Sequence, residues 1–239
     1  MHAAANRATL PFCTALEKMM AARYTLIVGT KDWSSWSLRA YVALRATQAR
    51  FVEVFVPLRQ QPLTGDEIRK YSKAGRVPIL KIEENGREVT VWDSLAICET
   101  LAERHPEAKL WPADALTRAE ARAYACEMHS GFPDVRDQLS MDFARRRPLP
   151  ALRDETKAQV ARIIEAWSSA LSRFGGEGGF LFGGFSVADC MYAPVVSRFV
   201  TYGVDVPPPV KAYMEKVMAL PAMRDWGLDS QKEVDAGVA

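Results

Sequence analysis

The stretch that decides the fold is Arg76-Val77-Pro78-Ile79-Leu80, in which a proline stands at the entrance of an apolar run. Because proline cannot donate a hydrogen bond to a neighbouring strand, Pro78 is acceptable only at the start or the edge of a strand. The backbone of Val77 is then free to pair with another extended chain, most completely if the Val77–Pro78 bond is cis. The stretch therefore predicts a strand from Ile79, with either an open main-chain position or a plain strand start before it.

Two further segments accompany this strand start. Asp93-Ser94 opens an apolar run with helical spacing, and Ser34-Ser35-Trp36-Ser37 forms a Ser-rich turn well upstream. Asp and Ser are preferred helix caps, so a structural interpretation of Asp93 and Ser94 is always available. The free N–H groups at a helix start also bind carboxylates, and the two interpretations stay open at this point.

The hydrophobic pattern of residues 23–105 predicts a small α/β domain. Apolar and β-branched runs predict strands over residues 24–28, 51–56, 79–82 and 88–91. Helical spacing predicts helices over 38–47 and 94–104, with a less well defined segment between the second and third strands. The opening strand–helix–strand unit should be parallel, whereas Asn85-Gly86 predicts an antiparallel hairpin for the last two strands.

The pattern changes after His105-Pro106, and everything downstream is expected to be helical. The expected helices cover residues 116–132, 152–174, 187–201 and 210–219, separated by Pro and Gly. We therefore expect a linker over 106–115 and an all-helical domain over 116–239. Ser186 and Asp189 have the spacing of a capping box at a helix start. Residues 1–22 lack a sustained apolar core and are expected to form a disordered N-terminal extension.

The composition excludes several classes of protein. The chain has 239 residues, of which 49% are hydrophobic and 25% charged, which is ordinary for a globular protein with its own core. The formal net charge of +2 is too small for a nucleic-acid surface, and the basic run Arg145-Arg146-Arg147 is expected to be a solvated loop. No apolar run reaches the roughly 18 residues that cross a bilayer, so we expect a soluble, cytoplasmic protein without membrane or nucleic-acid partners.

Metal and hydrolase chemistries are poorly supported. The four cysteines are scattered, without a C-x-x-C pair or a zinc spacing, and are expected to be reduced: Cys13, Cys98, Cys126 and Cys190. No H-E-x-x-H motif is present, so no metal is expected. A serine hydrolase needs a base and a nucleophile elbow, and the chain has three histidines and no G-x-S-x-G motif.

The order of these elements and motifs resembles the cytosolic glutathione transferase superfamily, over residues 24 to about 228. Ser34-Ser35-Trp36-Ser37-Leu38-Arg39 is similar to the Ser-Ser-Cys-Ser-x-Arg motif of the zeta class, the maleylacetoacetate isomerases, with Trp36 in the place of the cysteine. Trp111-Pro112-x-Asp114 and the segment 182–189 are similar to the superfamily's linker and second-domain signatures. The resemblance implies a thioredoxin-like first domain, a helical second domain and a homodimer.

The resemblance also implies a site for glutathione as co-substrate. Ser34, with Ser35 as the alternative, is expected to donate a hydrogen bond to the sulfur, since a hydroxyl donor and a helix N-terminus favour the thiolate. The residues expected to bind glutathione are Trp36, Arg76, Val77, Pro78, Asp93 and Ser94. The residues expected to face the electrophile are His129, Phe132, Arg136 and Met141.

Three functions compete on this evidence. The first is a glutathione transferase that adds the glutathione thiolate to small electrophiles in detoxification. The second is a glutathione-dependent cis-trans isomerase, which ranks lower because Trp36 replaces the zeta-class cysteine. The third is a non-catalytic protein that keeps the fold to bind partners.

Overall fold

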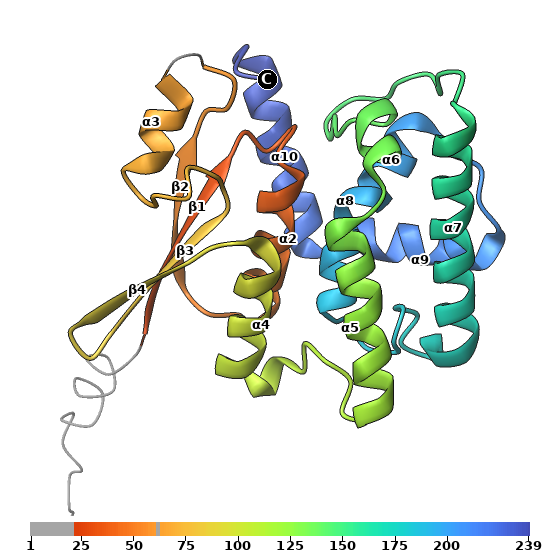
Figure 1. The fold of residues 1–239 in the computed structure, drawn as a ribbon, viewed down its shortest axis with the longest axis horizontal. Coiled ribbons are helices and arrows are strands. Elements are labelled where there is room, and N and C mark those ends of the chain that lie inside the picture. Colours follow the sequence, from red (N-terminus) through yellow and green to blue (C-terminus); the bar gives the residue numbers. More distant parts are fainter. Residues whose placement is uncertain (1–21, 61–62) are drawn as a thin grey trace, which may run out of the picture.

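The computed structural model describes residues 22–60 and 63–239 (Figure 1). The N-terminal extension expected over residues 1–22 therefore lies, apart from Ala22, outside the described residues, as does Cys13. In Figure 1 a mixed sheet with its helices forms one half of the molecule and a group of helices forms the other.

The described residues of the first half form seven elements. They are β1 (Arg23–Gly29), α2 (Ser35–Ala46), β2 (Phe51–Val56), α3 (Leu63–Arg69), β3 (Ile79–Glu84), β4 (Arg87–Val91) and α4 (Ser94–Arg104). The strand order is β2-β1-β3-β4, with β1 parallel to β2 and antiparallel to β3. The predicted hairpin is confirmed, because β3 and β4 are antiparallel and Asn85 and Gly86 have φ angles of 52° and 72°. The predicted α/β fold of this half is confirmed.

The second half consists of helices joined by loops. They are a short 3₁₀ turn (Pro106–Ala108), α5 (Ala115–Ser130), α6 (Pro133–Gln138), α7 (Asp154–Ala170) with a wider turn (Leu171–Gly175), α8 (Val187–Tyr202), α9 (Pro208–Met218) and α10 (Pro221–Asp235). The helix predicted over 116–132 ends at Ser130, because Gly131 is extended and Phe132 is left-handed with φ 61°. The all-helical second domain is confirmed.

The predicted capping box begins α8 at the centre of the second half. The Asp189 carboxylate accepts hydrogen bonds from the Ser186 N–H at 2.8 Å, the Ser186 hydroxyl at 2.9 Å and the Leu181 N–H at 3.1 Å. Burial raises the pKa of Asp189 to about 6 against these hydrogen bonds. The box therefore ties the buried start of α8 to the loop before it.

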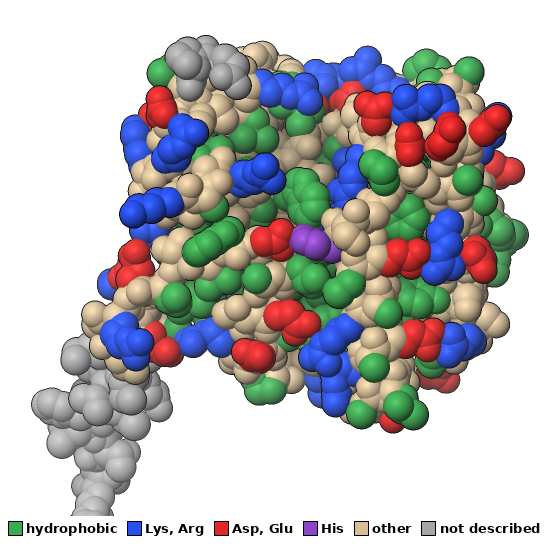
Figure 2. Space-filling model, in the orientation of Figure 1, with side chains coloured by type: hydrophobic (Ala, Val, Ile, Leu, Met, Phe, Trp, Pro, Cys, Tyr) green, Lys and Arg blue, Asp and Glu red, His purple; other side chains and the backbone are tan. Residues whose placement is uncertain are grey.

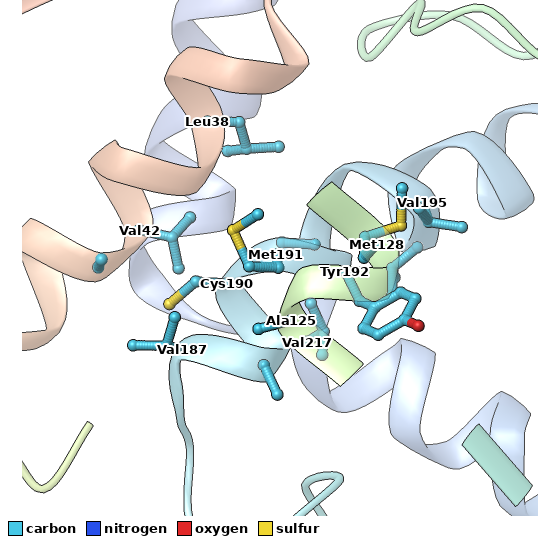
Figure 3. Packing of buried hydrophobic residues seen from close by; sticks show 14 of the residues in the cluster. Leu38, Val42, Ala125, Met128, Val187, Cys190, Met191, Tyr192, Val195 and Val217 are labelled. Atoms are coloured by element: carbon cyan, nitrogen blue, oxygen red, sulfur yellow. The ribbon is translucent and has the colours of Figure 1, made fainter. Parts of the chain in front are cut away.

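The two halves share one hydrophobic core, in which α2 packs on α8 (Figure 3). Leu38 and Val42 of α2 face Cys190 and Met191 of α8, and all four side chains are buried. Such close packing fixes the start of α2 against the second half of the molecule. In Figure 1 α10 crosses back to lie beside α2, which places the C-terminal helix next to the first domain.

Candidate functional site

A pocket of about 510 Å³ lies where the starts of β3 and α4 and the first turn of α2 meet the C-terminal end of α5. Its lining comprises Trp36, Ala74, Arg76, Val77, Pro78, Trp92, Asp93, Ser94 and His129. All six residues expected to bind glutathione thus surround one cavity. These six residues, which lie between positions 36 and 94, come together because they stand at or just before the beginnings of α2, β3 and α4.

The Val77–Pro78 segment forms one wall of this pocket. The ladder between β1 and β3 begins at Ile79, so Val77 lies outside it and lines the pocket. Pro78 is buried, and the Val77–Pro78 peptide bond is cis. Arg76 is exposed at the pocket wall. The main chain of Val77 beside the pocket is therefore not used by the sheet.

Asp93 acts both as a helix cap and as a charged group of the pocket. One of its carboxylate oxygens accepts a hydrogen bond from the Leu95 N–H at 2.8 Å, which caps α4. The other oxygen lies 3.4 Å from Nε2 of His129 on α5. The structural interpretation of Asp93 is correct, and it leaves the second oxygen facing the pocket region.

The Ser94 hydroxyl is a buried polar group of this pocket. Ser94 is 1% exposed, and its Oγ has no hydrogen-bond partner among the described residues. Most buried polar side-chain atoms have a partner, because an unpaired one costs about 1–3 kcal/mol. A buried, unpaired hydroxyl that lines a cavity at the positive end of a helix points to a polar or anionic ligand.

Trp36 lines the pocket and its ring packs against two arginines, one buried and one half-buried. The guanidinium carbons of Arg39 and Arg136 lie 4.3 Å and 4.9 Å from the centre of its ring, and the His129 ring meets it edge-on at 5.2 Å. Arg39 is wholly buried, and burial, followed by the charges of Arg136 and Arg198, lowers its pKa. Positive charge behind the indole therefore adds to the helix N-terminus in favouring an anion nearby.

The Ser-rich turn lies at the start of α2. The Ser34 hydroxyl donates a hydrogen bond to Ser37 Oγ at 2.7 Å, and Ser37 Oγ also accepts one from the Gly29 N–H at 3.1 Å. Ser35 is the first residue of α2, and its hydroxyl makes no hydrogen bond within residues 22–60 and 63–239. Neither serine is among the pocket-lining residues, although Ser35 directly precedes Trp36, which does line the pocket.

The structure does not gather the four residues expected at the electrophile into one place. His129 lines the pocket, and Arg136 stacks on Trp36 while donating hydrogen bonds to the carbonyls of Gly131 and Met128. Phe132 and Met141 are 6% and 4% exposed and belong to the hydrophobic core. Met141 also lines a different hollow, which is described below.

The basic run Arg145-Arg146-Arg147 is not simply a solvated loop. Arg145 pairs with the buried Asp32 at 2.9 Å and with Asp142 at 3.0 Å, and Arg147 pairs with Asp142 at 2.5 Å. The run lies in a loop and Arg146 and Arg147 are exposed, as expected. Arg145 is only half-buried because it pairs with a buried carboxylate more than a hundred residues away, which the pattern of charges does not reveal. Elsewhere, acidic and basic side chains are interspersed on the face seen in Figure 2.

Sequence analysis also missed two pocket residues, Ala74 and Trp92. Trp92 is 55% exposed at the end of β4, immediately before Asp93, and an exposed tryptophan beside a candidate binding residue is the signal that could have found it. Within the described part of the chain, no group of three potential metal ligands occurs. None of the helices described is long and apolar enough to span a membrane.

Comparison with known proteins extends this picture. The family model for the glutathione S-transferase N-terminal domain matches residues 33–104, and that for the C-terminal domain matches residues 150–226. A probable maleylacetoacetate isomerase of Caenorhabditis elegans is 24% identical over 175 residues, which cover 73% of this chain and 78% of the relative. Glutathione S-transferase omega-1 of Rattus norvegicus is 24% identical over 199 residues, which cover 81% and 76%.

Solved structures agree with these relatives. A glutathione transferase homolog from Burkholderia gl BGR1, with bound glutathione, has a TM-score of 0.63 and 26% identity over 88% of this chain and 98% of the other. Maleylacetoacetate isomerase from Anaeromyxobacter dehalogenans, with bound glutathione, has a TM-score of 0.65 and 24% identity, covering 89% and 98%. FzlA from C. crescentus has a TM-score of 0.66 and 24% identity, covering 85% and 91%. With the fold, the pocket and both domain matches in agreement, this chain belongs to the glutathione S-transferase superfamily.

Proposed function

We propose that this protein is a glutathione transferase, which binds glutathione in the 510 Å³ pocket and activates its sulfur for attack on small electrophiles. The observation that carries the proposal is the buried, unpaired Ser94 hydroxyl beside the Asp93 cap. Residues 23–105 then form the glutathione-binding domain, and residues 116–239 cover it.

Each end of glutathione has a chemically matched partner in this pocket. The Ser94 hydroxyl and the N-terminus of α4 suit the α-carboxylate of the γ-glutamyl group, and the second oxygen of Asp93, beside His129, suits its amine. The main chain of Val77 suits the cysteinyl residue, in the manner of an added strand. Arg76, exposed at the wall, suits the glycyl carboxylate.

The sulfur of glutathione needs stabilisation as an anion, since a thiol with a pKa of about 8.5 is mostly protonated at neutral pH. Lowering that pKa by about two units requires roughly 2.7 kcal/mol. A serine hydroxyl at the start of α2, the helix dipole and the cations on Trp36 act in this direction. Ser34 and Ser35 are the candidate donors. Among the residues that the structure describes, the Ser35 hydroxyl makes no hydrogen bond, whereas the Ser34 hydroxyl donates one to Ser37, and this difference favours Ser35 as the donor.

A glutathione-dependent isomerase is the second candidate function. The relative named as a probable maleylacetoacetate isomerase and the Ser-Ser-x-Ser turn favour it. In that reaction the thiolate adds to a double bond, rotation follows, and the thiolate leaves again. Turnover of maleylacetoacetate that depends on glutathione would place the protein in this class, and transfer to electrophiles without isomerisation would exclude it.

We further infer a cytoplasmic, homodimeric enzyme of detoxification, as the superfamily resemblance implies. The three cysteines described are free thiols, two of them buried, which suits a reducing compartment. Sedimentation at micromolar concentration should give the mass of a dimer, and a single monomeric species would contradict this part of the proposal.

Calorimetry with glutathione tests the binding site directly. The unmodified protein should release heat on titration, and Ser94→Ala should weaken binding about tenfold because one charge-assisted hydrogen bond is lost. Ser169→Ala is the matched control, since Ser169 lies on α7 and does not line the pocket. Equal affinity in Ser94→Ala and Ser169→Ala would refute the assigned site.

A further inference from the structure

A second hollow, of about 370 Å³, lies next to the Ser-rich turn and shares no lining residue with the glutathione pocket. Its lining comprises Trp33, Arg59, Ser140, Met141, Asp142, Arg145 and Arg147. Trp33 immediately precedes Ser34, and neighbouring Cα atoms are about 3.8 Å apart. A small molecule in this hollow would therefore lie close to the turn that holds the candidate sulfur-binding hydroxyls.

Arg59 is the least satisfied charge of this hollow. Its guanidinium carbon lies 4.3 Å from the centre of the Trp33 ring, and its backbone is left-handed with φ 61°. A non-glycine residue in this region of φ is uncommon. No carboxylate lies within ion-pair distance of Arg59 in residues 22–60 and 63–239. The Arg59 guanidinium therefore stacks on the Trp33 indole, and its N–H donors have no carboxylate acceptor among the described residues.

The opposite wall carries two more arginines around one carboxylate. Asp142 accepts from Arg145 at 3.0 Å and from Arg147 at 2.5 Å. Burial would raise the pKa of Asp142, but the hydrogen bonds from Arg147 and Arg145 outweigh it and lower the pKa, so the carboxylate stays charged. Three arginines and one aspartate line the hollow. Arg145 also contacts the buried Asp32 and the Ala239 oxygen at 3.2 Å, which leaves Arg59 as the unpaired positive charge of the lining among the described residues.

The rest of the lining comprises Trp33, Ser140 and Met141. Met141 is buried in the core, so the Trp33 ring is the main apolar surface of an otherwise polar hollow. Polar groups that converge beside an aromatic surface can orient a small molecule. The combination suits a ligand with a planar body and one compact anionic group.

We propose that this hollow binds the electrophilic acceptor and selects acceptors that carry a carboxylate, which Arg59 and Arg147 hold while the reactive carbon points toward the Ser34–Ser35 turn. The inference rests on the proposed function, because the hollow gains this role only if the glutathione sulfur lies at that turn. It adds the class of acceptor, and it moves the acceptor away from Phe132, which is core.

Two probes of similar shape test the selection, namely the anion para-(chloromethyl)benzoate and its neutral methyl ester. In both, the glutathione thiolate forms a carbon–sulfur bond at the benzylic carbon, chloride leaves with the bonding electrons, and the thiol proton passes to solvent. Each kcat/KM is divided by the rate of the reaction with free glutathione, so that intrinsic reactivity cancels. With the unmodified protein, this corrected kcat/KM should be higher for the carboxylate than for the ester.

The decisive variant is Arg59→Met, which keeps a long side chain and removes the charge. It should lower the carboxylate-to-ester ratio about tenfold, as expected for one charged hydrogen bond, and Arg59→Lys should recover part of it. Arg146→Met is the control, because Arg146 is exposed in the neighbouring loop and does not line the hollow. A ratio that changes less than twofold in Arg59→Met would overturn the inference.

Glutathione calorimetry on the same preparations separates the two proposals. Glutathione heat together with an unchanged ratio overturns the acceptor assignment and leaves the proposed function standing. Absence of glutathione heat from the unmodified protein overturns both. Arg59 is exposed, so its variants should unfold at the same denaturant concentration as the unmodified protein, which shows that a changed ratio is not a folding defect.

Discussion

The glutathione pocket and the second hollow, on either side of the Ser-rich turn, are lined by residues from different kinds of structural position. The glutathione pocket uses positions that the fold already needs, such as the residue before β3 and the cap of α4. The second hollow uses side chains on loops, namely Arg59, which makes no ion pair among the described residues, and the segment 140–147. Binding of the common substrate is therefore tied to the architecture, whereas the choice of acceptor can change without altering the fold.

The two hollows are nevertheless linked by one buried group, Asp32, whose removal should have the largest effect. Its carboxylate accepts from the Ala144 N–H at 2.9 Å, the Ser230 hydroxyl at 2.8 Å and Arg145 at 2.9 Å. Asp32→Ala would leave these donors unpaired in a buried place and should reduce the free energy of unfolding by about 3 kcal/mol or more. Urea unfolding measures this loss.

The exposed Asp154, which pairs with Lys157 at 2.7 Å, provides the comparison for that experiment. Asp154→Ala should change the free energy of unfolding by less than about 1 kcal/mol, because surface ion pairs contribute little. If the two variants proved equally stable, Asp32 would not join the turn to the loops of the second hollow.

Replacing the sulfur-binding hydroxyl should have the next largest effect. Loss of one donor to a developing anion costs about 2.7–4 kcal/mol, so Ser34→Ala or Ser35→Ala should lower kcat about a hundredfold. The variant with the larger loss of kcat identifies the donor. We expect it to be Ser35→Ala, because the Ser34 hydroxyl is engaged by Ser37 whereas that of Ser35 is free among the described residues. Steady-state kinetics with saturating glutathione would show it, and full activity in both variants would mean that no hydroxyl of this turn contacts the sulfur.

Asp93→Asn should separate the glutathione pocket from the acceptor hollow. Asn is as good a cap as Asp, so α4 should remain stable, while the lost charge should weaken glutathione binding about tenfold. The carboxylate-to-ester ratio defined above should stay constant, because Asp93 does not line the second hollow. A parallel fall in affinity and ratio would mean that the two hollows act as one site.

The smallest effect concerns the support of the turn by α10. Glu233 accepts a hydrogen bond from the Asp32 N–H at 3.2 Å, and burial raises its pKa from 4.5 to about 7. The folded state thus holds a proton that the unfolded chain releases between these values, so this group's contribution to stability is lost as the pH rises from 4.5 toward 7.

Glu233→Gln removes that loss. The variant should gain about 1 kcal/mol over the unmodified protein above pH 7 and nothing near pH 4.5, the gain being modest because the side chain is only partly buried. Urea unfolding at both pH values measures the difference. A gain that did not depend on pH would show that Glu233 is ionised to the same extent in both states.

Much of the glutathione pocket was predictable because its signals are local. Pro78 cannot donate a ladder hydrogen bond and so marks a strand start. Asp93 accepts a hydrogen bond from the N–H two residues on and caps α4, and Asn85-Gly86 closes a hairpin between adjacent strands. The second hollow was not predictable, since its parts meet only through contacts such as Arg145 with Asp32, more than a hundred residues apart. The sequence suggested Met141 as a residue near the electrophile. No local signal indicated that Arg59 would line the same hollow.

The most direct test of the account is a crystal structure of the protein with glutathione bound. We expect the γ-glutamyl carboxylate on the Ser94 hydroxyl and the sulfur within about 3.5 Å of the Ser34 or Ser35 hydroxyl. Glutathione bound elsewhere, or with its sulfur pointing away from this turn, would contradict the account.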